Sequence, residues 1–382
     1  MVADDQARRF GVEEEFLVVD RRTRETVARA GTVLRQAEKE LGSWVGGEIT
    51  EIQLEGRTTP CVTAAEAAGQ LARNRATLAA AAEEEGLGVI ASGTPVLDAS
   101  IPSPITEGPR QDRGNATFRG LHHELNICAL HVHVELPDRE RAVLVSNHLR
   151  PYLPVLIALA ANSPFWRGLD TGYASWRTLL WNRWPVAGPP PYLRSAAHYD
   201  ELVATLLEAE ALVDDGTIFW DVRPSARLPT LEVRVADVPI TAEESAALAA
   251  LVRGLVVSVL PWVDRGDPGP ELQPEFMRLA YWRAARDGMA GSGVDVLTGR
   301  PVPARELARR LLETARPGLE EHGDLRRVTA WLDGLAEHGD GATRQRRAAR
   351  DGRLTDVVDD LIRRTAPIGE TGVPDAQNSM TT

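Results

Sequence analysis

The segment Leu130-His-Val-His-Val-Glu-Leu136 gives the clearest indication of how this chain folds, because apolar and polar side chains alternate along it. Successive side chains of a β-strand point to opposite faces. His131, His133 and Glu135 would therefore share one face, and the valines and leucines the other. This period of two predicts a strand over Cys128–Leu136 with one apolar and one polar face.

Three further segments, Gly11–Asp20, Ile49–Glu55 and Thr230–Val235, alternate in the same way. Their polar faces would carry Glu13 and Glu15 in the first, Glu51 and Glu55 in the second, and Glu232 and Arg234 in the third. If all four strands lie in one sheet, the apolar face packs on helices and the polar face gathers carboxylates. Clustered like charges are costly unless a cation neutralises them, and oxygen ligands with some imidazole suit Mg²⁺ or Mn²⁺. The pattern predicts a divalent-metal site, and Mg²⁺ in turn usually recruits nucleotide phosphates.

Each acidic segment also has a simpler interpretation. Glu13 to Glu15 could be a solvated run of charge, and Glu232 with Arg234 could be an ion pair between strands. Glu48 and Glu55 are seven residues apart, which places them on opposite faces of an ideal strand. Both can serve one site only if a bend or bulge lies between them. It is the four segments together that favour a metal site.

Composition narrows the class of protein. The chain has 382 residues and a formal net charge of −12, which disfavours nucleic acid as a partner. Its two cysteines, Cys61 and Cys128, cannot form a disulfide framework and fit a reducing compartment. The N-terminus lacks an apolar signal core, and the apolar stretch over residues 151–161 is too short to span a bilayer. We expect a cytoplasmic protein with no membrane partner.

The rest of the chain alternates between helical and irregular patterns. Thr63–Glu85 and Thr241–Leu260 begin with cap residues and predict helices. Residues 93–118 are rich in Pro, Gly and charge and predict a long loop, and residues 163–195 predict an ordered aromatic loop region. The C-terminal part is mostly helical in pattern.

No linker divides the chain cleanly. The sequence therefore predicts one large α+β domain over residues 1–365 with a helical C-terminal part. Residues 366–382 are polar and predict a disordered tail.

Several motifs carry a resemblance to one family. They are Gly11-Val-Glu-Glu-Glu-Phe, Cys128-Ala-Leu-His-Val-His-Val, Ala161-Asn-Ser-Pro-Phe-Trp, Thr171-Gly-Tyr-Ala-Ser-Trp-Arg, Trp220-Asp-Val-Arg-Pro-Ser, Thr230-Leu-Glu-Val-Arg-Val-Ala-Asp, Trp282-Arg-Ala-Ala-Arg and Gly341-Ala-Thr-Arg-Gln-Arg. In this order they resemble the type 2 glutamate–cysteine ligase family, bacterial carboxylate–amine ligases of the glutamine synthetase superfamily. The resemblance runs from about residue 8 to about residue 363.

The resemblance implies a curved, mainly antiparallel sheet with helices on one face and an open, metal-lined face. It implies ATP-dependent joining of a carboxylate to an amine, most simply glutamate to cysteine, with Mg²⁺ or Mn²⁺. By motif position, the metal ligands would be Glu13, Glu15, Glu48, Glu55, His131 and Glu232. Arg234 would reach a phosphate, and His133 would lie close to the nucleotide. Arg177 and Arg223 would contact the transferred phosphoryl group or the substrate carboxylates, or else act as structural ion-pair partners.

Five residues depart from the family pattern. Ala129 and Glu135 stand where the family usually has Gly, Gln111 replaces the Tyr of a Pro-Arg-Tyr motif, and Ala280-Tyr281 replaces Glu-Asn. These departures leave the amine open, so a ligase for another amine or acid is an alternative. A metal-dependent hydrolase using His131 and His133, and a relative that binds nucleotide without turnover, are alternatives of other classes. A homodimer is also left open.

Overall fold

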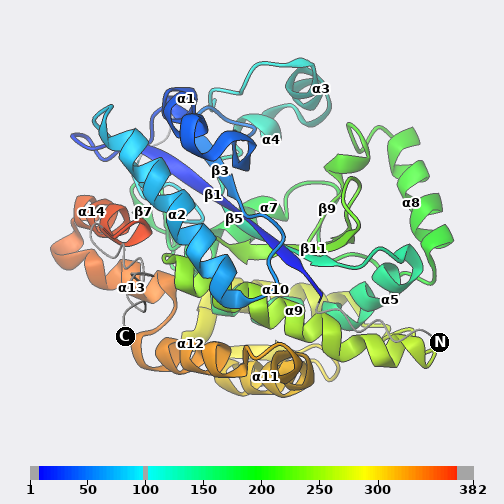
Figure 1. Ribbon diagram of the computed structural model, residues 1–382. Coiled ribbons are helices and arrows are strands. Elements are labelled where there is room, and N and C mark those ends of the chain that lie inside the picture. The colour runs from blue at the N-terminus through cyan, green and yellow to red at the C-terminus, as the bar shows by residue number, and fades with distance from the viewer. Residues whose placement is uncertain (1–7, 98–101, 368–382) are drawn as a thin grey trace, which may run out of the picture.

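A mainly antiparallel sheet runs through the centre of the protein (Figure 1). The structure is a computed structural model, and it describes residues 8–97 and 102–367. In these residues, the seven strands of the main sheet are, in order, β10 (Val222–Pro224), β11 (Thr230–Asp237), β5 (Ala129–Glu135), β1 (Phe10–Asp20), β3 (Gln53–Arg57) and β2 (Val45–Gly47), with β4 (Leu87–Ile90) paired to β1. Helices cover one face of this sheet, so the predicted α+β fold class is confirmed.

The register of the strands aligns their polar residues. The pairs that face each other across neighbouring strands are Glu13 with His131, Glu15 with Glu55, and Glu232 with His133. Because side chains alternate, the residues between them point to the other face. There Val12, Val132 and Val233 belong to one buried apolar cluster. The alternation predicted from sequence is therefore present in β1, β5 and β11.

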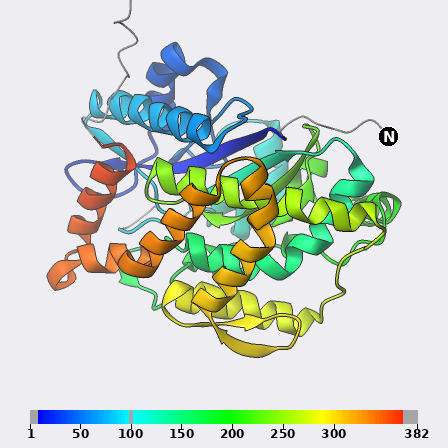
Figure 2. The ribbon, with the colours of Figure 1, turned by 60° about the horizontal axis from the view of Figure 1, so that its bottom comes forward.

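Helices form two layers against the apolar face (Figures 1 and 2). The layer next to the sheet contains α2 (Ala64–Glu83), α5 (Arg139–Leu149), α6 (Leu153–Ala160) and α9 (Ala242–Asp264). The outer layer contains α10 (Pro274–Asp287), α11 (Ala304–Glu321) and α12 (Leu325–His338), and α11 packs along α9. Both α2 and α9 begin with a capping box, Thr63 with Glu66 and Thr241 with Glu244.

Two apolar helical stretches of the described residues, 139–160 and 242–264, are long and apolar enough to cross a membrane by length and composition. In each of them 83% of the apolar window is buried inside the protein. Both stretches therefore serve as core helices of this fold.

Smaller elements surround the other face of the sheet. Beside it lie α3 (Pro109–Phe118), α4 (Gly120–His123) and α7 (Trp176–Trp181), whereas α1 (Ala30–Leu41) packs on α2 and α8 (Ala196–Glu208) packs on α5. The short two-stranded ladders of the described residues pair β6 (Phe165–Trp166) with β7 (Leu169–Asp170), β8 (Ala187–Gly188) with β9 (Phe219–Trp220), and β12 (Ser292–Asp295) with β13 (Arg300–Pro303).

Three local predictions need correction. Residues 93–118 are not wholly a loop, because α3 occupies the last ten of them. Its sequence PRQDRGNATF is too polar to show a helical period, and its start is marked only by Pro109 in the first turn. The aromatic region 163–195 contains the helix α7 as well as loops. The strand predicted over Ile49–Glu55 begins only at Gln53, because a turn precedes it.

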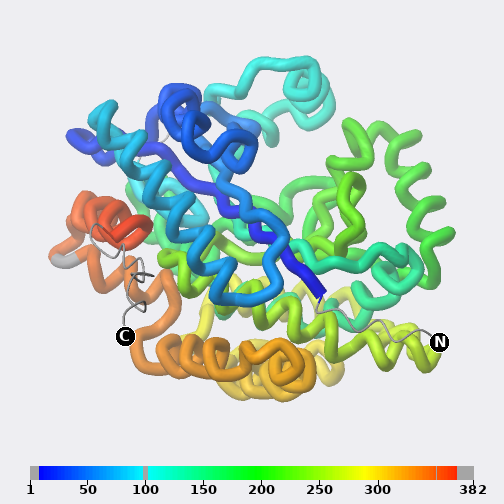
Figure 3. Tube along the Cα trace, viewed as in Figure 1, coloured from blue at the N-terminus to red at the C-terminus, as the bar shows by residue number. Residues whose placement is uncertain are grey.

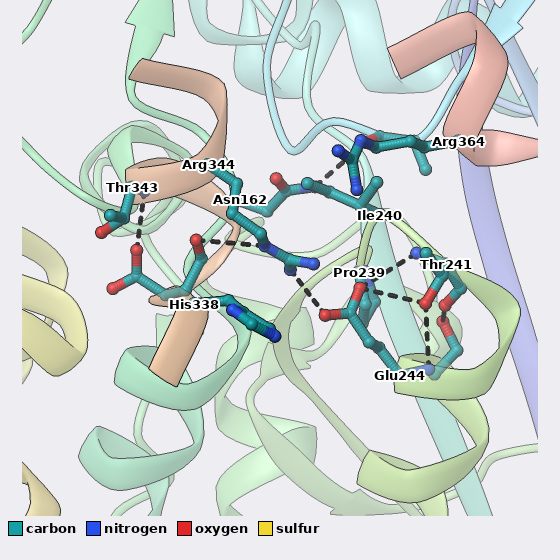
Figure 4. A network of polar contacts seen from close by, with 12 residues as sticks. Asn162, Pro239, Ile240, Thr241, Glu244, His338, Thr343, Arg344 and Arg364 are labelled. Carbon is teal, nitrogen blue, oxygen red and sulfur yellow. Dashed lines mark hydrogen bonds and ion pairs between the residues drawn. The ribbon is translucent and has the colours of Figure 1, made fainter. Parts of the chain in front are cut away.

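The C-terminal helices α13 (Gly341–Ala348) and α14 (Leu354–Thr365) return to the N-terminal half of the chain, where α14 contacts β4 (Figure 3). Arg344 of α13 donates a hydrogen bond to Glu244 at 2.5 Å, next to the cap of α9 (Figure 4). Gln345 is buried and donates to the side-chain oxygen of Asn162 at 2.8 Å. The predicted tail lies, from residue 368 onward, outside the described residues.

Candidate active site

A cleft of about 510 Å³ opens on the polar face of the sheet. All ten residues that the sequence singled out line this cleft: Glu13, Glu15, Glu48, Glu55, His131, His133, Arg177, Arg223, Glu232 and Arg234. They come from β1, β3, β5, β10 and β11, from α7, and from the segment before β3. The turn before Gln53 supplies the bend that Glu48 and Glu55 require.

The closest group of potential metal ligands consists of Glu13, Glu55 and His131, whose ligand atoms all lie within 4.8 Å of one another. Nδ1 of His131 is 3.2 Å from Oε2 of Glu13, and its Nε2 is 3.7 Å from Oε1 of Glu15. Nε2 of His133 is 3.6 Å from Oε2 of Glu13. Both Nε2 atoms are buried and have no hydrogen-bond partner among the described residues. Carboxylate oxygens facing unpartnered imidazole nitrogens are a donor set that fits a divalent cation.

Electrostatics support this fit. Burial raises the pKa of Glu15 to about 7. Burial, then the charges of Glu15 and Glu13, raise the pKa of Glu48 to about 8. Burial, and then the charges of Glu48 and Glu13, raise the pKa of Glu55 well above its usual value. Burial lowers the pKa of His131 to about 4, which keeps its imidazole neutral and able to donate a lone pair. A cation in this cluster would stabilise the charged form of each carboxylate.

Glu13 and His133 behave as a pair. Burial alone would raise the pKa of Glu13, but contacts with His131 and His133 outweigh it and hold the pKa well below its usual value. Burial likewise opposes a charge on His133, but the contact with Glu13 and the charge of Glu232 raise its pKa. Nδ1 of His133 lies 3.0 Å from Oγ1 of Thr230, which fixes the orientation of the ring.

Glu232 is held by two guanidinium groups. Arg223 donates to its two carboxylate oxygens at 2.9 and 3.3 Å, and Arg234 donates to Oε1 at 2.6 Å. Burial would raise the pKa of Glu232, but the charges of Arg223 and Arg234 outweigh it and lower the pKa. The guanidinium of Arg234 also lies 5.6 Å from the ring centre of Trp181, and its Nε is buried without a hydrogen-bond partner among the described residues. Glu232 and Arg234 therefore form an ion pair within one strand, whereas the pair between strands joins Glu232 to Arg223, and Arg234 keeps hydrogen-bonding capacity.

The guanidinium of Arg177 forms hydrogen bonds mainly within the protein. Its terminal nitrogens donate to the backbone carbonyls of Arg234 and Val235, and the side chain is buried. This geometry agrees with the structural alternative considered for Arg177.

Sequence reasoning missed a further charged residue of the cleft, Arg57, which contacts Glu55. The two residues are two positions apart on one strand, so the alternation used for the acids could have found Arg57.

The departures from the family pattern lie in different places. Ala129 and Gln111 line the cleft, and the N–H of Ala129 donates to Oε2 of Glu15 at 2.7 Å. Glu135 lies at the end of its strand, where it accepts from the backbone of Arg9 at 3.3 Å. Residues 280–281 are buried on α10.

The acidic, imidazole-bearing cleft lies on an antiparallel sheet backed by helices, a fold that solved structures share. A glutamate–cysteine ligase from Francisella tularensis, solved in complex with AMP, shares the fold with a TM-score of 0.69 at 13% identity, covering 94% of this chain and 88% of that one. A bifunctional glutathione synthetase from Pasteurella multocida gives a TM-score of 0.67 at 15% identity, covering 94% of this chain and 52% of that one. The chain belongs to glutamate–cysteine ligase family 2, whose model matches residues 9–360.

Curated relatives agree with this membership. A protein of Nocardia farcinica named "Putative glutamate–cysteine ligase 2-1" is 46% identical over 340 residues, which is 88% of each chain. A protein of the same name from Saccharopolyspora erythraea is 44% identical over 366 residues, which is 96% of each chain. The resemblance seen in the sequence motifs is thus confirmed, and the family is one of enzymes that form a carbon–nitrogen bond.

Proposed function

We propose that this protein is an ATP-dependent glutamate–cysteine ligase, which joins the γ-carboxylate of glutamate to the amine of cysteine. The observation that carries the proposal is the convergence of the predicted acids, imidazoles and arginines on one cleft, in a chain of this ligase family. The products would be γ-glutamylcysteine, ADP and phosphate.

The chemistry explains why these residue types are needed. An amine cannot displace oxide from a carboxylate, so the carboxylate must first gain a better leaving group. A carboxylate oxygen attacks the γ-phosphorus of ATP, the bond to ADP breaks, and an acyl phosphate forms. The amine then attacks the acyl carbon, phosphate leaves, and the amine loses a proton. Phosphoryl transfer depends mainly on positioning and on neutralising charge, which is the role we propose for Arg234 and Arg223.

Glu13, Glu55 and His131 would hold a divalent cation, Mg²⁺ or Mn²⁺, with Glu15, Glu48 and Glu232 as further ligands of the same cleft. When bound, such a cation would neutralise phosphate charge. Protein groups would do the rest of the positioning. His133 would lie close to the nucleotide, and Arg177 would hold the strand that carries Arg234.

The test is a substrate panel with the purified protein. Each amino acid, singly and with a second amine, is mixed with ATP and Mg²⁺ or Mn²⁺, and ADP release and product mass are measured. We expect ADP release with glutamate and cysteine together, a product of the mass of γ-glutamylcysteine, and loss of both with a metal chelator. The proposal would be overturned if none of the carboxylate–amine pairs stimulated ADP release. Hydrolysis without nucleotide would favour a hydrolase, and nucleotide binding without turnover would favour a non-catalytic relative.

A second candidate is a ligase that uses a different amine. It is favoured by one observation, that Ala129 and Gln111, which depart from the family pattern, both line the cleft. The same panel decides between the two, because a preference for another amine over cysteine would select this candidate. In either case we infer a cytoplasmic enzyme of small molecules that binds neither nucleic acid nor membranes. A homodimer stays a prediction.

A further inference from the structure

Strand β11 contains a β-bulge beside the cleft, between Val233 and Ala236. Val233 pairs with Val132 of β5, and the next pair is Ala236 with Leu130. Between these pairs β11 advances by three residues and β5 by two, so β11 has one extra residue. A bulge interrupts the hydrogen-bond ladder and leaves backbone groups that need other partners. Arg234 lies within this bulge.

Arg177 of α7 supplies the missing partners. Its Nη2 donates to the carbonyl oxygen of Arg234 at 3.0 Å, and its Nη1 donates to that of Val235 at 3.1 Å. A guanidinium presents several N–H groups in one rigid plane, so it can hold two neighbouring carbonyls at once. The bulge is thereby fixed from the side by a buried side chain.

The bulge also decides where Asp237 points. Leu231, Val233 and Val235 alternate into the apolar cluster, and unbroken alternation would place Asp237 there too. With the extra residue, Ala236 joins that cluster instead. Asp237 is turned toward α7, although it remains buried.

Asp237 holds the surroundings of Arg177 in place. Its carboxylate accepts hydrogen bonds from Oγ of Ser163 at 2.7 Å, from Oγ of Ser175 at 2.9 Å and from the backbone N–H of Asn162 at 2.9 Å. Oγ of Ser163 in turn accepts from the backbone N–H of Arg177 at 3.0 Å. Oδ1 of Asp237 lies 3.8 Å from Nη1 of Arg177. The carboxylate therefore fixes both the backbone and the charge of this arginine.

We propose that Asp237 is a positioning residue for the ligase reaction. By holding Arg177 against the bulge, it sets the backbone from which Arg234 reaches the cleft and contacts Glu232. The inference rests on the proposed function, in which Arg234 neutralises phosphate charge. Asp237 does not line the cleft, so we expect its effect on catalysis to pass through Arg177 and the bulge to Arg234.

The first test compares Asp237→Asn with a matched control, Asp324→Asn. Asp324 is also buried and contacts a buried arginine, Arg253 of α9, but neither residue lines the cleft. We expect Asp237→Asn to lower kcat by about 10- to 100-fold, because a small misplacement of a catalytic group is enough for such a loss. The KM values for both amino acids should change little. Asp324→Asn should lower the melting temperature and leave kcat within about twofold. Equal kcat in the two variants would overturn the proposal.

The second test is a double-mutant cycle with Arg234→Ala. If Asp237 acts through Arg234, Asp237→Asn should lower kcat by less than about twofold once Arg234 is absent. If the two residues act independently, the fold-losses in kcat of the two single variants should multiply in the double variant. Multiplying effects would overturn the proposal. Should Asp237→Asn fail to fold, Ser163→Ala removes one hydrogen bond of the same network and enters the same cycle.

Affinity for Mg-ATP, measured by calorimetry on the same variants, separates this inference from the proposed function. A wild-type protein that turns over no carboxylate–amine pair would overturn the proposed function. In that case the Mg-ATP affinities of the variants still test the role of Asp237. Asp237→Asn should weaken Mg-ATP binding in the wild-type background and not in the Arg234→Ala background, and weakening in both would overturn the positioning role.

Discussion

Two arginine–glutamate pairs lie on opposite faces of the same sheet and use their hydrogen-bonding groups differently. On the helix-covered face, Arg75 of α2 donates to both carboxylate oxygens of Glu14, at 2.9 and 2.5 Å, and to backbone carbonyls of residues 239–240. On the cleft face, Arg234 donates to Glu232 at 2.6 Å, and its buried Nε has no partner among the described residues. Arg75 and Glu14 are fully buried, whereas the side chain of Arg234 is 11% exposed.

The difference shows how a structural arginine can be told from one available to a ligand. The N–H groups of Arg75 are used by protein acceptors, so its removal should affect folding. Arg234 keeps donors beside a cleft, so its removal should affect binding and catalysis. On β1 the neighbours Glu13 and Glu14 face opposite sides of the sheet, and only Glu14 has a buried arginine that uses its donors on the protein.

The strongest test of this comparison is Arg75→Met. Removing one partner of a buried ion pair leaves an uncompensated charge, here that of Glu14, and we expect a loss of about 3–5 kcal/mol in the free energy of unfolding. Urea denaturation measures it. Mg-ATP affinity of the folded protein should not change, because Arg75 lies on the face away from the cleft.

A control comes from removing both charges. The double variant Glu14→Gln with Arg75→Met should recover part of the lost stability, since replacing both partners of a buried pair costs less than removing one. A loss below about 1 kcal/mol for Arg75→Met would show that the pair does not stabilise the fold as its geometry indicates.

The second test is Arg234→Lys. A lysine keeps the charge but not the planar set of donors, so it cannot hold Glu232 and a phosphate together. We expect kcat to fall by about 10²–10³, equivalent to about 2.7–4 kcal/mol, as for other donors that stabilise developing charge. Arg141→Lys is the control, since Arg141 pairs with Asp264 at the surface. Should Arg234→Lys instead lower stability and keep kcat, the two arginines would both be structural.

The sequence contained enough information for most of the sheet and the site. Alternation is a local property, so β1, β5 and β11 could be predicted from a few residues each. The same alternation placed Glu13 and Glu15 on the cleft face before any register was known. Charge clustering then indicated a cation, because like charges gather on one face only where something neutralises them.

Features that depend on register or on distant contacts could not be predicted. The bulge in β11 becomes visible only once its pairing with β5 is known, so Asp237 could be quoted from sequence as the end of a family motif but not given a role. The partner of Glu14 is Arg75, 61 positions away on a helix. Helix α3 buries only Gly114 and Phe118, so its sequence has no apolar stripe of helical period.

A smaller effect is expected where the C-terminal helices meet the helix layer (Figure 4). Arg344 donates to Glu244, whose carboxylate also accepts from Thr241 in the capping box of α9. Arg344→Met should cost about 1–2 kcal/mol, less than Arg75→Met, because Glu244 keeps its capping contacts. Thermal unfolding measures it, and an unchanged kcat is expected because Arg344 does not line the cleft. A kcat loss without a loss of stability would contradict this assignment.

The smallest effect concerns a surface pair beside the cleft. Arg110 of α3 donates to both carboxylate oxygens of Asp214, at 3.0 and 3.1 Å, and so connects two segments 104 residues apart. Both side chains are partly exposed, so Arg110→Ala and Asp214→Asn should each cost only about 0.2–1 kcal/mol of stability. The loss should shrink in high salt, because exposed charges are screened. Arg110 also lines the cleft, whereas Asp214 does not. The KM values of the two variants therefore show whether Arg110 only forms the ion pair with Asp214 or also binds a substrate. We expect the two variants to change KM equally, since both break the same bridge. A rise in KM confined to Arg110→Ala would show that Arg110, like Arg234, offers its donors to a substrate.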